Sequence, residues 1–367
     1  GAIAAGVDLD TYTKPFKDSF FEDIGALRIE RAEHYPAATD HIAQMIELIQ
    51  RLIDAGHAYV SEDGCVYYDV NSFKAYGALA HLDKSGLKSG ARVAQDEYEK
   101  ENLSDFALWK ALTSADGDIA WDSPWGKGRP GWHIECSAMS MAYLGESFDL
   151  HTGGIDNMFP HHENEIAQSE GATGAPFSRY WMHCGHLIVD GAKMSKSAGN
   201  FYTLRDLLDK GYAGREIRYV LLSAQYRQPL NFTFSGLDGA RTTLQRLDAY
   251  LERLSDLSAD HTAEADSEDA PEWARAGLQG FTNAMDDDLN TPVALACVFD
   301  MVHAGNRDMD AGALSAQAAS SALAVLKRID EILDVFNAPD EGPPDAVMDL
   351  VAERQGARAS KDFAASD

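Results

Sequence analysis

Apolar residues in the first part of the chain recur with two different periods. Four isoleucines between residues 42 and 53 recur at helical spacing after Thr39-Asp40, and this pattern predicts a helix with a polar cap. Residues 58–70 instead alternate around Asp63-Gly64, which predicts a β-hairpin. Short apolar runs that favour further buried elements lie at 106–110, 148–151 and 180–189. The first part of the chain is therefore expected to be mixed α/β.

The pattern becomes helical from about residue 236. Leucines at every third or fourth position between 244 and 254 form one stripe, which is typical of a core-facing helix. Asn290-Thr291-Pro292 predicts another helix start, because proline is tolerated in the first turn. Between them, residues 255–271 are acidic and rich in serine, which predicts a solvated linker. We expect one more apolar face from Ile329, Ile332, Leu333 and Phe336, and a last helix from about Asp345, after Pro343-Pro344.

The net charge of the chain alters the expected function more than its overall amino-acid composition does. The 367 residues include 59 acidic and 31 basic side chains, giving a net charge of −28. One interpretation of this acidic excess is that the protein does not bind RNA, because RNA-binding proteins normally present a basic surface. The other is that the protein has a halophile-like acidic surface, with basic residues only where RNA or ATP docks. We favour the second interpretation, because the motifs described below are more specific than the charge.

The location of the protein is predicted from what the sequence contains. No run of eighteen apolar residues occurs, and the first residues carry no basic segment typical of a leader peptide, so we expect neither a membrane span nor a targeting signal. The four cysteines have no paired spacing, which favours a reducing compartment. We therefore expect a cytoplasmic protein, and we expect it to be a monomer.

The candidate chemistry is concentrated between Gly131 and Glu165. Cys136, His161 and Glu165 offer a thiolate, an imidazole and a carboxylate, which are the ligand types that zinc takes. His161 and Glu165 are four residues apart and would share one face of a helix whose first turn contains Pro160. Each residue alone has an ordinary alternative, a buried cysteine or a solvated helix start, but their combination favours a metal site.

Two further stretches suit a nucleotide. Gly153-Gly154 follows the expected strand at 148–151, and the carboxyl ends of strands in open α/β sheets bind ligands. Asp156 lies next to these glycines and is a candidate for a ribose hydroxyl or an ammonium group. Lys193 and Lys196 are three residues apart after the turn Asp190-Gly191, and two ammonium groups can neutralise charge that develops on a triphosphate. A bare glycine pair or lysine pair is more often an ordinary turn.

Taken in order, three motifs resemble the cysteinyl-tRNA synthetase family. They are Gly131-Trp-His-Ile-Glu-Cys-Ser-Ala-Met, the run from Gly153 through Pro160-His-His-Glu-Asn-Glu to Gln168, and Lys193-Met-Ser-Lys-Ser. The resemblance implies an α/β fold: a partial class I synthetase nucleotide-binding (Rossmann-like) domain with an insertion, followed by an α-helical bundle. It implies an insertion and connective region over 1–130, the second half of the catalytic domain over 131–235, and a bundle on the tRNA side over 236–367.

The resemblance also assigns roles to the candidate residues. Lys196 would be the main ATP contact and Lys193 would support it, with Mg²⁺ accompanying the ATP. Zinc would hold the thiolate of L-cysteine. Trp132 would wall the amino-acid pocket and His133 would stand behind the metal. The partners implied are ATP, L-cysteine and tRNA(Cys).

The sequence departs from the family pattern in one respect. The family's His-x-Gly-His ATP loop, and a first zinc cysteine ahead of it, are not found, since His183-Cys-Gly-His186 lies beside the lysine loop instead. The fourth zinc ligand is therefore undefined. We expect a fragment that by itself does not exchange pyrophosphate into ATP, and that is less stable than a form extended at its N-terminus. The alternatives are the ATP-dependent cysteine ligase of mycothiol synthesis and a non-catalytic zinc- and RNA-binding remnant.

Overall fold

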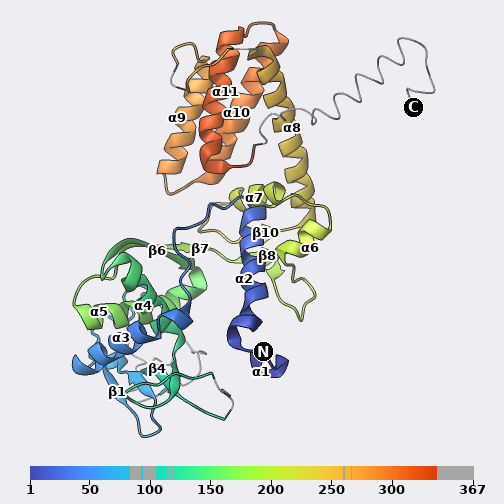
Figure 1. Ribbon diagram of the computed structural model, residues 1–367. Coiled ribbons are helices and arrows are strands. Elements are labelled where there is room, and N and C mark those ends of the chain that lie inside the picture. The colour runs from blue at the N-terminus through green and yellow to red at the C-terminus, as the bar shows by residue number, and fades with distance from the viewer. Residues whose placement is uncertain are drawn as a thin grey trace, which may run out of the picture. The chain divides into compact units, whose positions relative to one another are not determined.

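A computed structural model describes residues 1–82, 105–114, 116–117, 119–258, 261–265 and 267–336, together with the backbone of Arg92-Val93. The expected break at Pro343-Pro344 and the last helix lie outside these residues. The chain forms two compact units. The first contains the described residues of 1–24, 30–186 and 227–229, and the second contains those of 25–29, 187–226 and 230–336 (Figure 1).

The first unit is built on a small mixed sheet covered by helices. Its strands are β1 (Ala58–Val60), β2 (Val66–Tyr68), β3 (Arg92–Val93), β4 (Asp105–Ala111) and β5 (Gly128–Pro130). They run in the order β1-β2-β4-β3, with β5 also paired to β4. The predicted hairpin is confirmed: β1 and β2 pair antiparallel, and Gly64 in the turn has φ 83°, which favours glycine.

Three helices of the first unit share one core with that sheet. They are α3 (Ile42–Asp54), α4 (Trp132–Leu144) and α5 (Glu163–Thr173), and they contact one another in pairs (Figure 1). The predicted isoleucine face of α3 is partly wrong. Met45, Leu48 and Leu52 are buried, whereas Ile46 and Ile53 are only half-buried, because the helix is packed by the sheet on one side and by two helices on another.

A separate pair of strands in the first unit carries the glycine motif. The strands β6 (Phe148–Gly154) and β7 (Ser178–Cys184) pair in parallel, with Gly153 opposite His183. The unit begins with the helices α1 (Ala2–Ala5) and α2 (Leu9–Ala26). The predicted parallel strand at 148–151 is therefore confirmed, with both glycines at its carboxyl end. Its expected burial is wrong, because Leu150 is 51% exposed and Phe148 and His151 are only half-buried.

The second unit contains a small sheet and a helical bundle. The strands β8 (Leu187–Val189), β9 (Ala192–Lys193) and β10 (Leu230–Phe232) pack with the helices α6 (Leu204–Asp209) and α7 (Gly214–Leu222). The predicted turn Asp190-Gly191 is confirmed, because both residues have positive φ, 49° and 75°, in a two-residue connection between antiparallel strands.

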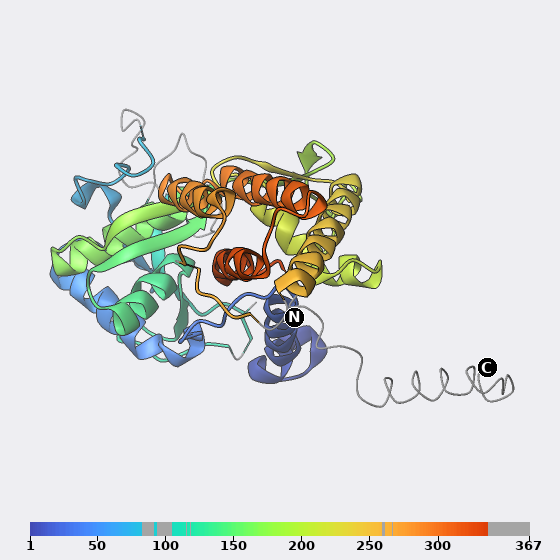
Figure 2. The ribbon, with the colours of Figure 1, turned by 90° about the horizontal axis from the view of Figure 1, so that it is seen from above.

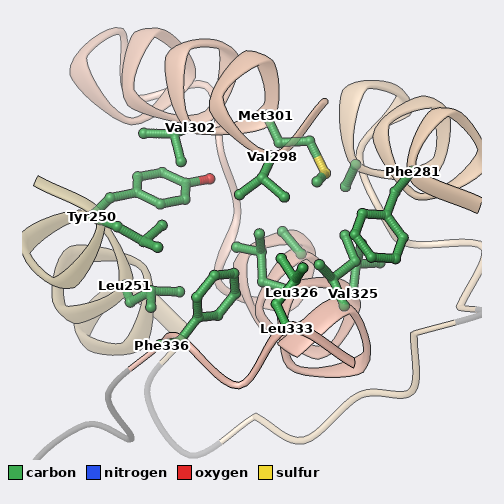
Figure 3. Packing of buried hydrophobic residues seen from close by; sticks show 14 of the residues in the cluster. Tyr250, Leu251, Phe281, Val298, Met301, Val302, Val325, Leu326, Leu333 and Phe336 are labelled. Carbon is green, nitrogen blue, oxygen red and sulfur yellow. The ribbon is translucent and has the colours of Figure 1, made fainter. Parts of the chain in front are cut away.

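The bundle consists of α8 (Phe234–Ser258), α9 (Glu272–Asp286), α10 (Thr291–Asp310) and α11 (Ala316–Leu333) (Figures 1 and 2). The predicted leucine stripe of α8 is confirmed as core. Tyr250 and Leu251 face Val302 of α10 and Phe336 in Figure 3. The expected face of α11 is wrong at Ile332, whose side chain is 55% exposed. The helix ends at Leu333, where Asp334 takes a left-handed φ of 48°, and the chain turns to bury Phe336 instead.

No helix among the residues described here is long and apolar enough to cross a membrane.

Candidate metal and nucleotide sites

Two helices and a turn bring the three predicted metal ligands together. Cys136 lies in the second turn of α4, Glu165 lies in the first turn of α5, and His161 precedes α5. Their ligand atoms all lie within 4.8 Å of one another, and His161 Nε2 is 3.9 Å from Glu165 Oε2. All three side chains that the spacing singled out therefore converge, although Cys136 is distant from the others in sequence.

The predicted helix over His161 and Glu165 needs one correction. The α-helix begins only at Glu163, after an irregular turn over Met158–His162 in which Phe159 is extended, with φ −136° and ψ 131°. Pro160 therefore lies in this turn rather than in the first turn of α5. The chain regains helical angles by His162 (φ −69°, ψ −33°), so His161 and Glu165 still point to the same place.

The carboxylate of Glu165 is buried without hydrogen bonds. Its side chain has no exposed area, and neither oxygen has a hydrogen-bond partner among the residues described. The imidazole nitrogen nearest to it, Nε2 of His151, lies 3.3 Å from Oε2 without the alignment of a hydrogen bond. A buried carboxylate is costly unless a cation or donors compensate it. Together with a thiol and an imidazole, this carboxylate fits a bound divalent metal.

The thiol of Cys136 is protonated while no metal is bound. Burial, together with the nearby carboxylates of Glu165 and Glu135, raises its pKa to about 12. A thiolate, not a thiol, binds a metal. Metal binding to this site must therefore displace a proton from Cys136.

Trp132 and His133 both lie against the ring of His161 and against each other, with ring centroids 4.4–5.2 Å apart. The indole of Trp132 stacks on the His161 ring with centroids 4.4 Å apart and planes 24° apart, while 42% of Trp132 remains exposed. His133 Nδ1 is 2.7 Å from His161 Nδ1. Burial, His161 and Lys110 lower the pKa of His133 to about 3, so His133 is a neutral hydrogen-bond partner. The two rings fix the orientation of His161.

Several residues of this region were not predicted as site residues. His162 Nε2 lies 3.8 Å from Glu165 Oε2, and His162 Nδ1 is 2.8 Å from His183 Nε2. His151 reaches the same carboxylate from β6. Burial lowers the pKa of His162 to about 3, with smaller effects of the neighbouring histidines. The only signal for His151, His162 and His183 in the sequence is the number of histidines near the metal motif.

Two residues inside the His-His-Glu-Asn-Glu run have a structural role. The carboxylate of Glu163 accepts hydrogen bonds from the backbone N–H groups of Gly77 and Ala80, at 2.8 and 2.7 Å. Asn164 Oδ1 accepts one from the hydroxyl of Tyr76 at 2.6 Å. Both side chains hold the chain around residues 76–80 against the start of α5, next to the candidate ligands.

Gly153 has a packing role that the sequence did not reveal. A Cβ atom at this position would lie 2.6 Å from Cε1 and 2.9 Å from Nε2 of His162. A Cβ at Gly154 would approach only the side chain of Asp156, which is exposed in the turn Ile155–Asn157. Nucleotide contacts of these three residues stay a prediction, whereas the contact of Gly153 with the histidine ring is a feature of the fold.

We expect Gly153→Ala to lower the free energy of unfolding by about 1–3 kcal/mol, the usual cost of an overpacked site. Thermal or urea unfolding measures it. Gly239→Ala is the matched control, because no atom lies within 4 Å of a Cβ there and alanine stabilises a helix relative to glycine. Equal stability of the two variants would contradict the packing role.

In the second unit, Lys193 and Lys196 belong to a loop that is held together by hydrogen bonds of the Asn200 side chain. Lys193 ends β9, and both lysines are exposed. Asn200 Oδ1 accepts from the Ser195 N–H at 2.9 Å, and Asn200 Nδ2 donates to the Lys193 carbonyl at 3.1 Å. Lys196 Nζ lies 5.3 Å from the ring centroid of Phe201. The loop therefore presents two ammonium groups at the surface, as a contact with phosphate oxygens requires.

Comparisons with known proteins agree on one family. Residues 2–242 match the family model "tRNA synthetases class I (C) catalytic domain", and residues 280–337 match the DALR domain. A curated cysteine–tRNA ligase from Protochlamydia amoebophila is 50% identical, with all of this chain and 77% of the relative covered. The cysteine–tRNA ligase from Chlamydia caviae is 49% identical at the same coverage.

Solved structures show the fold. Methionyl-tRNA synthetase from Mycobacterium tuberculosis, in complex with methionyl-adenylate, superposes with a TM-score of 0.62 at 17% identity, covering 91% of this chain and 79% of that one. A putative arginyl-tRNA synthetase from Campylobacter jejuni gives a TM-score of 0.56 at 11% identity, covering 87% and 66%. The expected class I fold, an α/β catalytic part followed by helices, is thus confirmed.

Proposed function

Since the chain belongs to the cysteine–tRNA ligase family, we propose that it acts in the joining of L-cysteine to tRNA(Cys) in two steps. In the first step the carboxylate of cysteine attacks the α-phosphate of ATP, and pyrophosphate leaves. In the second step a ribose hydroxyl at the end of the tRNA attacks the carbonyl of the adenylate, and AMP leaves. We also propose that the protein works as a cytoplasmic monomer.

One observation carries the choice of cysteine as the substrate: the convergence of Cys136, His161 and Glu165. These residues would hold zinc, which when bound takes a thiolate ligand in strong preference to the hydroxyl of serine. His133 keeps the His161 ring oriented through its hydrogen bond. Trp132 would cover one side of the amino acid, because it already stacks on His161 while 42% of its surface is exposed.

We assign the nucleotide to the lysine loop and the glycine motif. Lys196, supported by Lys193, would contact the phosphates of ATP, which carries Mg²⁺, and would stabilise negative charge that develops at the α-phosphate. Gly153, Gly154 and Asp156 would contact the remainder of the nucleotide at the end of β6. The hydrogen bonds of Asn200 limit the conformations of the loop before ATP binds, which lowers the entropy cost of contact.

The alternatives are less well supported. The match to the DALR domain over residues 280–337, together with curated cysteine–tRNA ligases that are about 50% identical over the whole chain, favours the synthetase over a cysteine ligase of mycothiol synthesis. The match of residues 2–242 to a catalytic domain favours an enzyme over a zinc- and RNA-binding remnant.

Cysteine-dependent exchange of labelled pyrophosphate into ATP, followed by charging of tRNA(Cys), tests the proposal. The chain spans 77% of the length of its relatives, so exchange is measured for this chain and for a version extended to their length. We expect the extended version to be active with cysteine and inactive with serine. Equal exchange with both amino acids would contradict selection by a metal site. Activity of the 367-residue chain alone would contradict our expectation that it needs the extension.

A further inference from the structure

A second set of metal-ligand side chains lies beside the first and shares one residue with it. We infer that His151, His162 and Glu165 form a second position for a divalent metal ion such as zinc. This inference rests on the proposed zinc site of Cys136, His161 and Glu165, because Glu165 would serve both.

The three donors come from different elements and meet in the protein interior. His151 lies on β6, His162 lies in the turn before α5, and Glu165 lies on α5. Their ligand atoms all lie within 4.8 Å of one another. The side chains of His162 and Glu165 are 2% and 0% exposed, and that of His151 is 14% exposed. Such burial separates this group from the exposed acidic clusters common on protein surfaces.

The distances suit ligands of a common ion better than hydrogen bonds. Glu165 Oε2 lies 3.3 Å from Nε2 of His151 and 3.8 Å from Nε2 of His162, and neither contact is a hydrogen bond. Ligand atoms at ~2.0 Å from a tetrahedral ion are separated by about 3.3 Å. The carboxylate of Glu165, which no hydrogen bond holds among the described residues, would need to approach His162 by only about 0.5 Å to complete such an arrangement.

The far side of His162 is already fixed. Its Nδ1 is 2.8 Å from Nε2 of His183, so Nε2 is the nitrogen left to face Glu165. Metal-binding histidines usually have their second nitrogen occupied in this way, which fixes the ring and its tautomer. The ring of His162 also lies against Gly153, where a Cβ atom would come within 2.6 Å of it. The imidazole is therefore held in place from two directions.

Glu165 can serve both positions because neither of its oxygens has a hydrogen bond among the described residues, and its Oε2 lies within 3.9 Å of His161 of the first set and of His151 and His162 of the second. Shared carboxylates are common where two metal ions lie about 3.5–4 Å apart. The two ligand sets differ in chemistry: the first includes a thiolate, whereas the second has only nitrogen and oxygen donors. Sets of two histidines and one glutamate hold zinc in hydrolytic enzymes and leave a coordination position open for water or a ligand. We therefore expect the second position to bind metal more weakly and to remain accessible.

Cobalt(II) titration of the 367-residue chain distinguishes the two positions. Cobalt(II) takes the same ligand types as zinc, and only thiolate-bound cobalt gives an intense near-ultraviolet charge-transfer band. We expect wild type to bind two equivalents, the first with this band and the second without it. Cys136→Ala should keep one equivalent and lose the band. The double variant His151→Gln and His162→Gln should keep the band and lose the second equivalent.

The control is His186→Gln, the same substitution at an exposed histidine in the same unit, which should bind as wild type does. Circular dichroism of every variant excludes loss of folding, and the single variant His151→Gln replaces the double variant if that one does not fold. Saturation of folded wild type at one equivalent, with no cobalt bound by Cys136→Ala, would overturn the second position. Absence of the thiolate band from wild type would instead overturn the zinc site of the proposed function.

Discussion

Lys196→Ala should reduce the rate of cysteine-dependent ATP–pyrophosphate exchange by about 10²–10³, with a smaller change in the KM for ATP. The reason is that the ammonium group is proposed to stabilise charge that develops in the transition state, so its loss affects kcat more than ground-state binding. The size follows from the cost of removing one donor from a developing oxyanion. Lys193→Ala should have the same direction and a smaller size. The measurement is made in the longest active form of the protein.

Lys210→Ala provides a matched control. Lys210 is exposed, belongs to the same unit, and has Nζ 5.8 Å from the ring centroid of Phe234, much as Lys196 lies over Phe201 at 5.3 Å. Both substitutions therefore remove one charge and one cation–π contact. If Lys210→Ala slows exchange as much as Lys196→Ala does, net charge rather than a phosphate contact explains the effect.

Local patterns in the sequence were sufficient to predict most of the elements. The hairpin at 58–70, the turn Asp190-Gly191 and the leucine stripe of α8 depend on residues close in sequence, whose periods and turn residues are visible in the chain. Ile332 was assigned wrongly because helical periodicity continues past it, while the left-handed Asp334 that ends this run has no strong sequence signal. The helical spacing of apolar residues alone does not predict a helix end that tertiary packing determines.

The candidate metal site was predictable for a different reason. Cys136, His161 and Glu165 combine the three ligand types that zinc takes, and the resemblance ordered them. His151 and His162 were missed because nothing in their spacing shows that β6 and α5 meet at Glu165. Gly153 was assigned to a nucleotide because it follows an expected strand. The sequence does not show which neighbouring side chain leaves no room for a Cβ atom at this position. That neighbour, the ring of His162, is visible only in three dimensions.

Cys136→Ala is expected to abolish tight zinc binding by the first ligand set. Substituting a residue that only orients a metal ligand typically lowers metal affinity 10–100-fold, and removing a ligand should cost at least as much. The variant is measured by competition with a chelator of known affinity, so that tight and weak zinc are separated. Zinc at ~100 times its Kd should stabilise wild type against unfolding by about 2.7 kcal/mol, and the same zinc concentration should stabilise the variant much less.

Cys65→Ala tests whether the loss of any half-buried thiol has this effect. Cys65 and Cys136 belong to the same unit and to the same class of partial burial, but the sulfur of Cys65 accepts a backbone N–H from Ala111 at 3.3 Å. Cys65→Ala should lower the free energy of unfolding slightly in the absence of zinc and leave the affinity for zinc unchanged. Equal zinc affinity of Cys136→Ala and wild type would remove the thiolate from the site. The preference for cysteine over serine would then need a source other than a sulfur-ligated metal, because pocket contacts alone discriminate by only ~1–3 kcal/mol.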